Sequence, residues 1–190
     1  MMGVKNTEER KILKRVSLND IVPKNHIIRK IDSAVDLSFI HDKVKDLYSP
    51  YGVESIDPIV LFKIVVIQYI FGIRSMRQTI KEIEVNMAYR WYIGYGLDEQ
   101  IPHFSTFGKN YKRRFEGTEI FEDIFKHIVQ EIIKCKFVDE ENIFIDGTHI
   151  KASANNKKSM SKLIEVSAKF YEEALHQEIS KDRKIHKKKL

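Results

Sequence analysis

The sequence predicts a mainly α-helical protein in which a set of helices is followed by a short β-hairpin. Two observations support this fold class. Apolar residues recur at helical spacing through much of the chain, most clearly over residues 59–71 and 120–133. The spacing then changes to a short β-type run at residues 143–145, directly before Asp146 and Gly147, a strong hairpin signal. We therefore expect three segments: a helical domain over residues 1–138, the first hairpin of an incomplete α/β domain over 139–160, and a basic helical tail over 161–190.

The clearest helix begins at Asp57 and Pro58. An aspartate can accept the first free backbone N–H groups of a helix, and proline is tolerated at the first helical position. The run 59–71 is apolar almost all round, so this helix must be buried on most of its sides. Its many β-branched residues make a strand the competing interpretation. Its length and its two caps, with Gly72 at the C-terminal end, favour the helix.

Two shorter elements are predicted next. Ser75 and Gln78 have the spacing of a capping box, which predicts that a helix begins there after a tight connection. A further short element carries Trp91 and Tyr92 and ends at Gly94 or Gly96. We expect both aromatic side chains to lie in the core rather than to stack on bases.

Two more helices precede the predicted hairpin. Ser105 is the expected N-cap of one that runs through Phe115, and Thr118 the expected N-cap of the next. The second of these shows the apolar stripe of residues 120–133, typical of one helix face packed on a core. We expect Cys135, at its end, to be a packing residue.

The segment after the hairpin returns to helical spacing. Residues 155–159 are predicted to form a loop, and a helix is expected from residue 161 to about 179. Its apolar positions are Leu163, Val166, Phe170 and Ala174. A lone hairpin is only marginally stable in water, so we expect that the chain is incomplete and that further strands follow it.

The charge is concentrated at one end. Acidic and basic residues balance over residues 1–150, so the net charge of +6 arises in residues 151–190. A basic end on a neutral body indicates a polyanionic partner, usually nucleic acid. The alternative is a solvated tail that is only partly ordered.

Membrane and extracellular proteins are excluded by other features. The longest apolar run is too short to span a bilayer, and the polar N-terminus lacks the apolar stretch of a signal peptide. A single cysteine permits no internal disulfide. We expect a cytoplasmic protein without a membrane partner.

Asp146 is the residue with the clearest chemical potential. A carboxylate at the end of an apolar strand is rigidly placed and can bind a hard cation such as Mg²⁺. Phosphoryl transfer on DNA commonly uses two such ions, and one carboxylate cannot hold both. The alternative interpretation is that Asp146 is only the aspartate of an Asp-Gly turn.

Several motifs, in their order and spacing, resemble those of a known family. Residues 143–152 resemble the first catalytic strand of the DDE transposases of bacterial insertion sequences, and residues 57–115 resemble their N-terminal helical domain, the InsH-like transposase domain. The resemblance covers residues from about 16 to 158. It is carried in the helical part by Asp57-Pro58 with the apolar helix, and by residues 72–77, 89–92 and 102–107.

The resemblance implies Mg²⁺-dependent DNA transposition by an RNase H-like catalytic domain. Asp146 matches the first aspartate of the catalytic triad and a Mg²⁺ ligand. The second aspartate and the glutamate of that family lie far downstream. No acidic residue after Asp146 has a comparable strand context here. The sequence therefore predicts a truncated transposase, and whether it is an enzyme by itself is open.

Basic residues are the candidate DNA contacts, either to the phosphate backbone or merely as a solvated helix face. The candidates are Arg74, Arg77, Lys109, Lys112, Arg113, Arg114 and Lys151.

Three functional hypotheses remain. The first is a transposase fragment that positions transposon ends but does not cut alone. The second is a non-catalytic product that binds the terminal inverted repeats, another copy of itself or a full-length transposase, and so competes with the active enzyme. The third is a decayed reading frame whose product barely folds.

Overall fold

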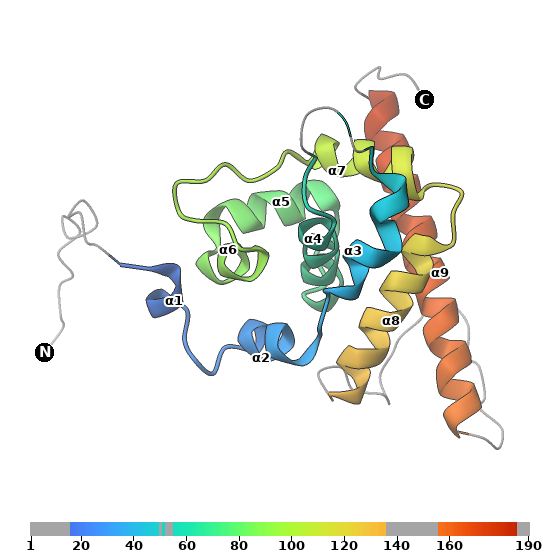
Figure 1. Cartoon of the computed structure of the whole chain (residues 1–190), viewed down its shortest axis with the longest axis horizontal. Helices are drawn as coiled ribbons and strands as arrows, with labels where there is room; N and C mark the ends of the chain where they lie inside the picture. Colours follow the sequence, from blue (N-terminus) through green and yellow to red (C-terminus); the bar gives the residue numbers. More distant parts are fainter. Residues whose placement is uncertain (1–15, 50, 52–54, 136–155, 186–190) are drawn as a thin grey trace, which may run out of the picture.

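The computed structural model describes residues 16–49, 51, 55–135 and 156–185, with side chains from residue 164 onward in the last range. Figure 1 shows helices packed around a central helix, α4. The helical elements are α1 (Leu18–Ile21), α2 (Ile27–Ala34), α3 (Phe39–Val44), the short 3₁₀ helix η2 (Lys45–Leu47), α4 (Pro58–Ile70), α5 (Met76–Val85), α6 (Met87–Ile93), α7 (Phe104–Asn110), the π-helix η3 (Tyr111–Phe115), α8 (Ile120–Lys134) and α9 (Asn156–Ile185).

The central helix α4 confirms the local signals in its sequence. The Asp57 side chain accepts a hydrogen bond from the backbone N–H of Ile59 at 2.8 Å, and Pro58 occupies the first turn. Gly72, just past the helix end, has a φ of 59°, which glycine adopts without steric cost. Most of the helix is buried because other helices surround it.

The helices α5 and α6 both begin at side-chain caps. Ser75 Oγ accepts from the backbone N–H of Gln78 at 3.2 Å, so half of the predicted capping box forms. The other half does not form, because the Gln78 amide donates to Glu82 instead, at 3.3 Å. Asn86 ends α5 and caps α6, since its Oδ1 accepts from the N–H groups of Ala88 and Tyr89.

Two predicted caps are wrong. His103 rather than Ser105 caps α7, because its Nδ1 accepts from the Ser105 backbone N–H at 3.2 Å. The Thr118 hydroxyl donates to the Phe115 carbonyl at 2.8 Å and caps nothing, and α8 begins at Ile120. The predicted stripe of α8 is confirmed, with its apolar face buried. Its neighbour Cys135 is exposed and does not pack in the core.

The long helix α9 packs along α8, as Figure 1 shows at the right of the molecule. Its buried apolar side chains are Ile164, Ala168, Leu175 and Ile179. The face predicted from the sequence is wrong, since Phe170 is 53% exposed. Fully burying a large aliphatic side chain contributes about 1.5–3 kcal/mol, whereas an exposed ion pair contributes about 0–1 kcal/mol. Apolar contacts therefore dominate the packing of α9.

Tyr171 fixes the orientation of α9 further. Its ring stacks on Phe125 of α8 with centroids 4.7 Å apart and meets Tyr69 of α4 edge-on at 5.7 Å. Its hydroxyl donates to Oε1 of Gln68 at 3.0 Å, which satisfies a buried polar side chain on α4. The α9 helix is thus joined to both α8 and the central helix.

The predicted fold class needs correction. The residues that the structure describes contain no strand or sheet, so the expected β-hairpin and RNase H-like α/β domain are not found there. The hairpin residues lie outside the described part, and residues 156–160, expected in the same domain, already belong to α9. Because lysine is a good helix former and each added residue extends a helix at little cost, α9 includes residues 156–159 of the predicted loop.

Candidate nucleic-acid interface

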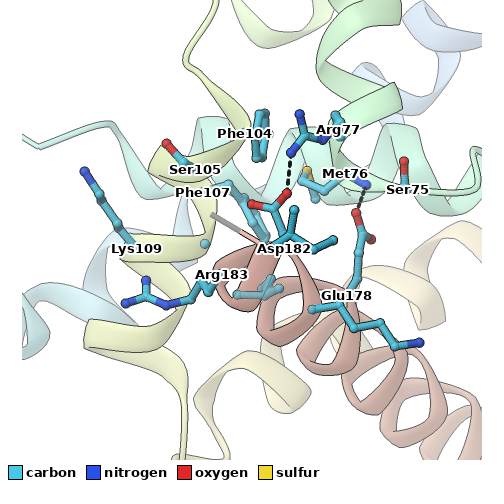
Figure 2. Close-up of a pocket in the computed structure, with 14 residues that line it drawn as sticks. Ser75, Met76, Arg77, Phe104, Ser105, Phe107, Lys109, Glu178, Asp182 and Arg183 are labelled. Carbon is cyan, nitrogen blue, oxygen red and sulfur yellow. Dashed lines mark hydrogen bonds and ion pairs between the residues drawn. The ribbon is translucent and has the colours of Figure 1, made fainter. Parts of the chain in front are cut away.

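The connection from α4 to α5 presents two of the predicted DNA contacts. Arg74 lies in the connection itself and is exposed. Arg77 lies in the first turn of α5, where its guanidinium is held from two sides. It donates to Oδ1 of Asp182 on α9, and it lies 3.8 Å above the ring centre of Phe104. Figure 2 shows both neighbours around Arg77. Arg77 is therefore a fixed and already paired cation.

The basic group at the junction of α7 and the π-helix divides into two kinds. Lys109 and Arg113 are exposed and have no ion-pair partner within the part of the chain that the structure describes. Lys112 is half-buried, with its Nζ 3.8 Å from a carboxylate oxygen of Glu116. The sequence predicted that the four cations share one helix surface. In the structure only part of this group is accessible to a ligand.

Arg114 serves the packing of the same junction. Its guanidinium donates to Oδ1 of the buried Asn110 and lies 4.1 Å from the ring centre of Tyr48. Burial raises the pKa of the Tyr48 hydroxyl, and the positive charge of Arg114 lowers it in part. Arg114 thus takes part in the packing of this junction, and its role as a DNA contact stays a prediction.

A hollow of about 230 Å³ opens between α5, α7 and α9, and Figure 2 looks into it. Its apolar wall includes Met76, Phe107 and Ile179. Lys109 stands on one side of it and Glu178 on the other. The hollow therefore has apolar walls, with ionisable groups of both signs around it.

Glu178 of α9 lies at the edge of this hollow and was not among the residues predicted from the sequence. Its Oε1 accepts from the backbone N–H of Met76 at 2.6 Å, at the positive end of the α5 dipole. Burial nevertheless raises its pKa, since loss of solvation disfavours the charged form more than these donors favour it. The signal available in the sequence was the spacing of Glu178 and Asp182, which places them on one face of a helix.

Glu172 and His176 of α9 make a second set of polar contacts. The Tyr111 hydroxyl donates to Oε1 of Glu172 at 3.0 Å, and His176 lies 3.4 Å from a carboxylate oxygen of Glu116. Burial raises the pKa of the Glu172 carboxyl. These residues tie α9 to the π-helix. Within the described ranges, no group of three or more histidine, cysteine, aspartate or glutamate side chains is placed to hold a metal ion.

Two further residues were predicted to belong to the site. Asp146, the expected catalytic residue and Mg²⁺ ligand, and Lys151, an expected DNA contact, lie outside the described residues. Both stay predictions. Although α9 is 30 residues long, none of the described helices is long and apolar enough to cross a membrane.

Comparison with protein families gives one match. A family model for a transposase domain (DUF772) covers residues 16–113, from α1 into the π-helix. Arg74, Arg77 and Lys109 lie inside this segment, while α8 and α9 lie beyond it. No curated protein and no solved structure matches the chain. Because the match spans about half of its residues, the chain belongs to the transposase domain family DUF772.

Proposed function

We propose that this transposase-family chain binds DNA and contributes to the movement of a bacterial insertion sequence by holding the element's terminal inverted repeats. The family supports a transposase-related role. The observation that carries the DNA-binding part is the pair of exposed cations Lys109 and Arg113, four residues apart. Exposed lysine and arginine side chains bind backbone phosphates without reading sequence. Arg74, exposed in the connection before α5, is a further candidate contact.

Any chemistry in this proposal depends on residues outside the described part. Asp146 would supply one ligand to Mg²⁺, which stabilises the charge that develops during phosphoryl transfer. One carboxylate cannot hold the two ions that such a reaction uses, so further carboxylates must come from elsewhere. The binding proposal does not depend on this step, and it can be tested without any cleavage assay.

The test measures the binding of the full chain to a labelled duplex over a range of salt concentrations. We expect the double variant Lys109→Gln/Arg113→Gln to weaken binding and to reduce the slope of log affinity against log salt by about two, roughly one per phosphate contact. Lys30→Gln is the control, because Lys30 is also an exposed lysine and lies on α2. An unchanged slope in the double variant, or an equal loss in Lys30→Gln, would contradict the proposed surface.

Specificity for the element's ends is a separate measurement. A duplex that carries the terminal inverted repeat and a random duplex of the same length are compared at one salt concentration. We expect tighter binding to the repeat, because contacts to base edges add to the phosphate contacts. Equal affinity for both duplexes would reduce the function to non-specific DNA binding.

A further inference from the structure

The helix α9 directs two carboxylates, one turn apart, at the start of α5. Glu178 accepts the Met76 backbone N–H at 2.6 Å, and Asp182 accepts a hydrogen bond from the Arg77 guanidinium. Figure 2 shows the two contacts side by side. A carboxylate and a phosphate are alternative partners for the same cationic donors. Asp182 therefore takes a cationic donor that a DNA phosphate could otherwise bind.

The Arg77 guanidinium is in contact with both an aromatic ring and a carboxylate. It lies against the Phe104 ring at 3.8 Å, so one face is covered while Asp182 takes a donor at the edge. The Arg77 side chain is 43% exposed, so solvent and ligands can reach it. A phosphate that approaches Arg77 must either displace the carboxylate of Asp182 or overcome the electrostatic repulsion between the two anions.

The part of α9 that carries Asp182 lies beyond Ile179, the last buried side chain of this helix in the described range. Beyond Ile179, no side chain of α9 within the described residues is buried, and Ile185 is 76% exposed. Segments held mainly by polar contacts open at a lower free-energy cost than segments held by a core. The turn of α9 that carries Asp182 can therefore open while Ile179 and the residues before it stay packed.

The positions of Arg77 and Asp182 along the chain support a regulatory contact. Arg77 and Phe104 lie inside the segment that matches the transposase domain family, whereas Asp182 lies beyond it. The basic residue thus belongs to the domain, and the acidic residue is supplied by a helix that follows the domain.

We propose that the end of α9 is an autoinhibitory contact, in which Asp182 occupies Arg77 and competes with DNA phosphates for it. The inference rests on the proposed DNA binding and adds its regulation. DNA binding and docking of the α9 end then oppose each other, so a change that releases Asp182 raises DNA affinity.

The experiment compares the affinities of full-chain variants for a labelled random-sequence duplex at one low salt concentration. We expect Asp182→Asn to bind at least roughly fivefold more tightly than the unaltered chain, the lower end of typical coupling between two sites. Glu173→Gln is the matched control, because Glu173 is an exposed acid on the same helix and loses the same charge. Its affinity should change much less.

A variant in Arg77 separates local competition from a general charge effect. In the Arg77→Gln background, Asp182→Asn should give no more gain than Glu173→Gln, because the cation to be released is gone. An equal gain with and without Arg77 would overturn the inference, and so would an Asp182→Asn variant that gains no more than the control. Circular dichroism of each variant confirms that the helices remain.

The outcomes also distinguish the inference from the function on which it rests. If the unaltered chain binds DNA with salt dependence and Asp182→Asn shows no specific gain, autoinhibition fails and DNA binding stands. If neither the unaltered chain nor any of these variants binds the duplex, both proposals fail together.

Discussion

At the scale of single residues, Glu178 shows how burial and a helix end act against each other. The N–H groups of Met76 and Arg77 and the side chain of Gln68 favour its ionised form, while burial and the nearby Asp182 disfavour it. Burial is the largest of these effects, so the pKa of the native carboxyl is raised. The native state therefore holds this proton more tightly than the unfolded chain. The stability that this bound proton adds to the native state is complete at pH values below the unfolded pKa. It is lost as pH rises through the native pKa.

This sign leads to a prediction for Glu178→Gln. The glutamine keeps an acceptor for the Met76 N–H but has no charge to desolvate and does not titrate. We expect the free energy of unfolding of the variant, relative to the unaltered chain, to be most favourable near neutral pH and to decline as the solution is acidified. Urea unfolding at several pH values measures this difference. Glu173→Gln, on the exposed face of α9, serves as the control. A relative stability that grows on acidification would show that the native pKa is lowered instead.

The sequence predicted the cations of the site better than their partners. Arg77 was singled out because it starts a helix, but its partner Asp182 lies 105 residues away, and no local pattern records that separation. The same holds for Arg114, whose contact with the Tyr48 ring joins distant segments. Asn110, next to Arg114, is polar and buried, which only the packed structure reveals. Residue type therefore identified the candidate DNA contacts, and tertiary contacts determine which of them are accessible to a ligand.

At the scale of elements, local signals located the helices, while packing decided which faces are buried. Asp57 and Gly72 bound α4 as predicted, because capping depends on residues within one turn. In α9, two stripes at helical spacing compete, one with Phe170 and one with Leu175. The rings of Phe125 and Tyr69 select the face with Tyr171, and the Leu175 stripe is buried with it. Such a choice depends on the partner helices and could not be made from the α9 sequence alone.

The crossing of α7 and α9 depends on the small size of Gly108. A Cβ at this position would lie 3.3 Å from Cγ2 of Ile179, tighter than ordinary packing. We expect Gly108→Val to lower the free energy of unfolding by about 1–3 kcal/mol, the usual cost of overpacking. Chemical denaturation measures the loss. In an Ile179→Ala background the added side chain has room, so the same substitution should cost less. An equal cost in both backgrounds would show that the approach of the helices is not limiting.

At the scale of the whole molecule, one apolar cluster joins the early and the late helices. It includes Ile28 of α2, Ile64 of α4 and Leu175 of α9, although α8 and α9 lie beyond the segment matched by the family model. The single tryptophan, Trp91, lies on α6, with the Arg29 guanidinium 4.3 Å from its ring centre. Trp91 therefore reports on a region that does not include α9.

A shared core implies that a change in α9 is felt at Trp91. We expect Leu175→Ala to lower the free energy of unfolding by about 2–5 kcal/mol, because it removes a buried side chain and leaves a cavity. If the described helices unfold as one unit, far-UV circular dichroism and Trp91 fluorescence shift to the same lower denaturant midpoint. A Trp91 transition that stays in place while the dichroism changes would show that α9 unfolds separately. A broad transition in the unaltered chain would instead favour the hypothesis of a decayed product that barely folds, because cooperative unfolding requires this core to form as a whole.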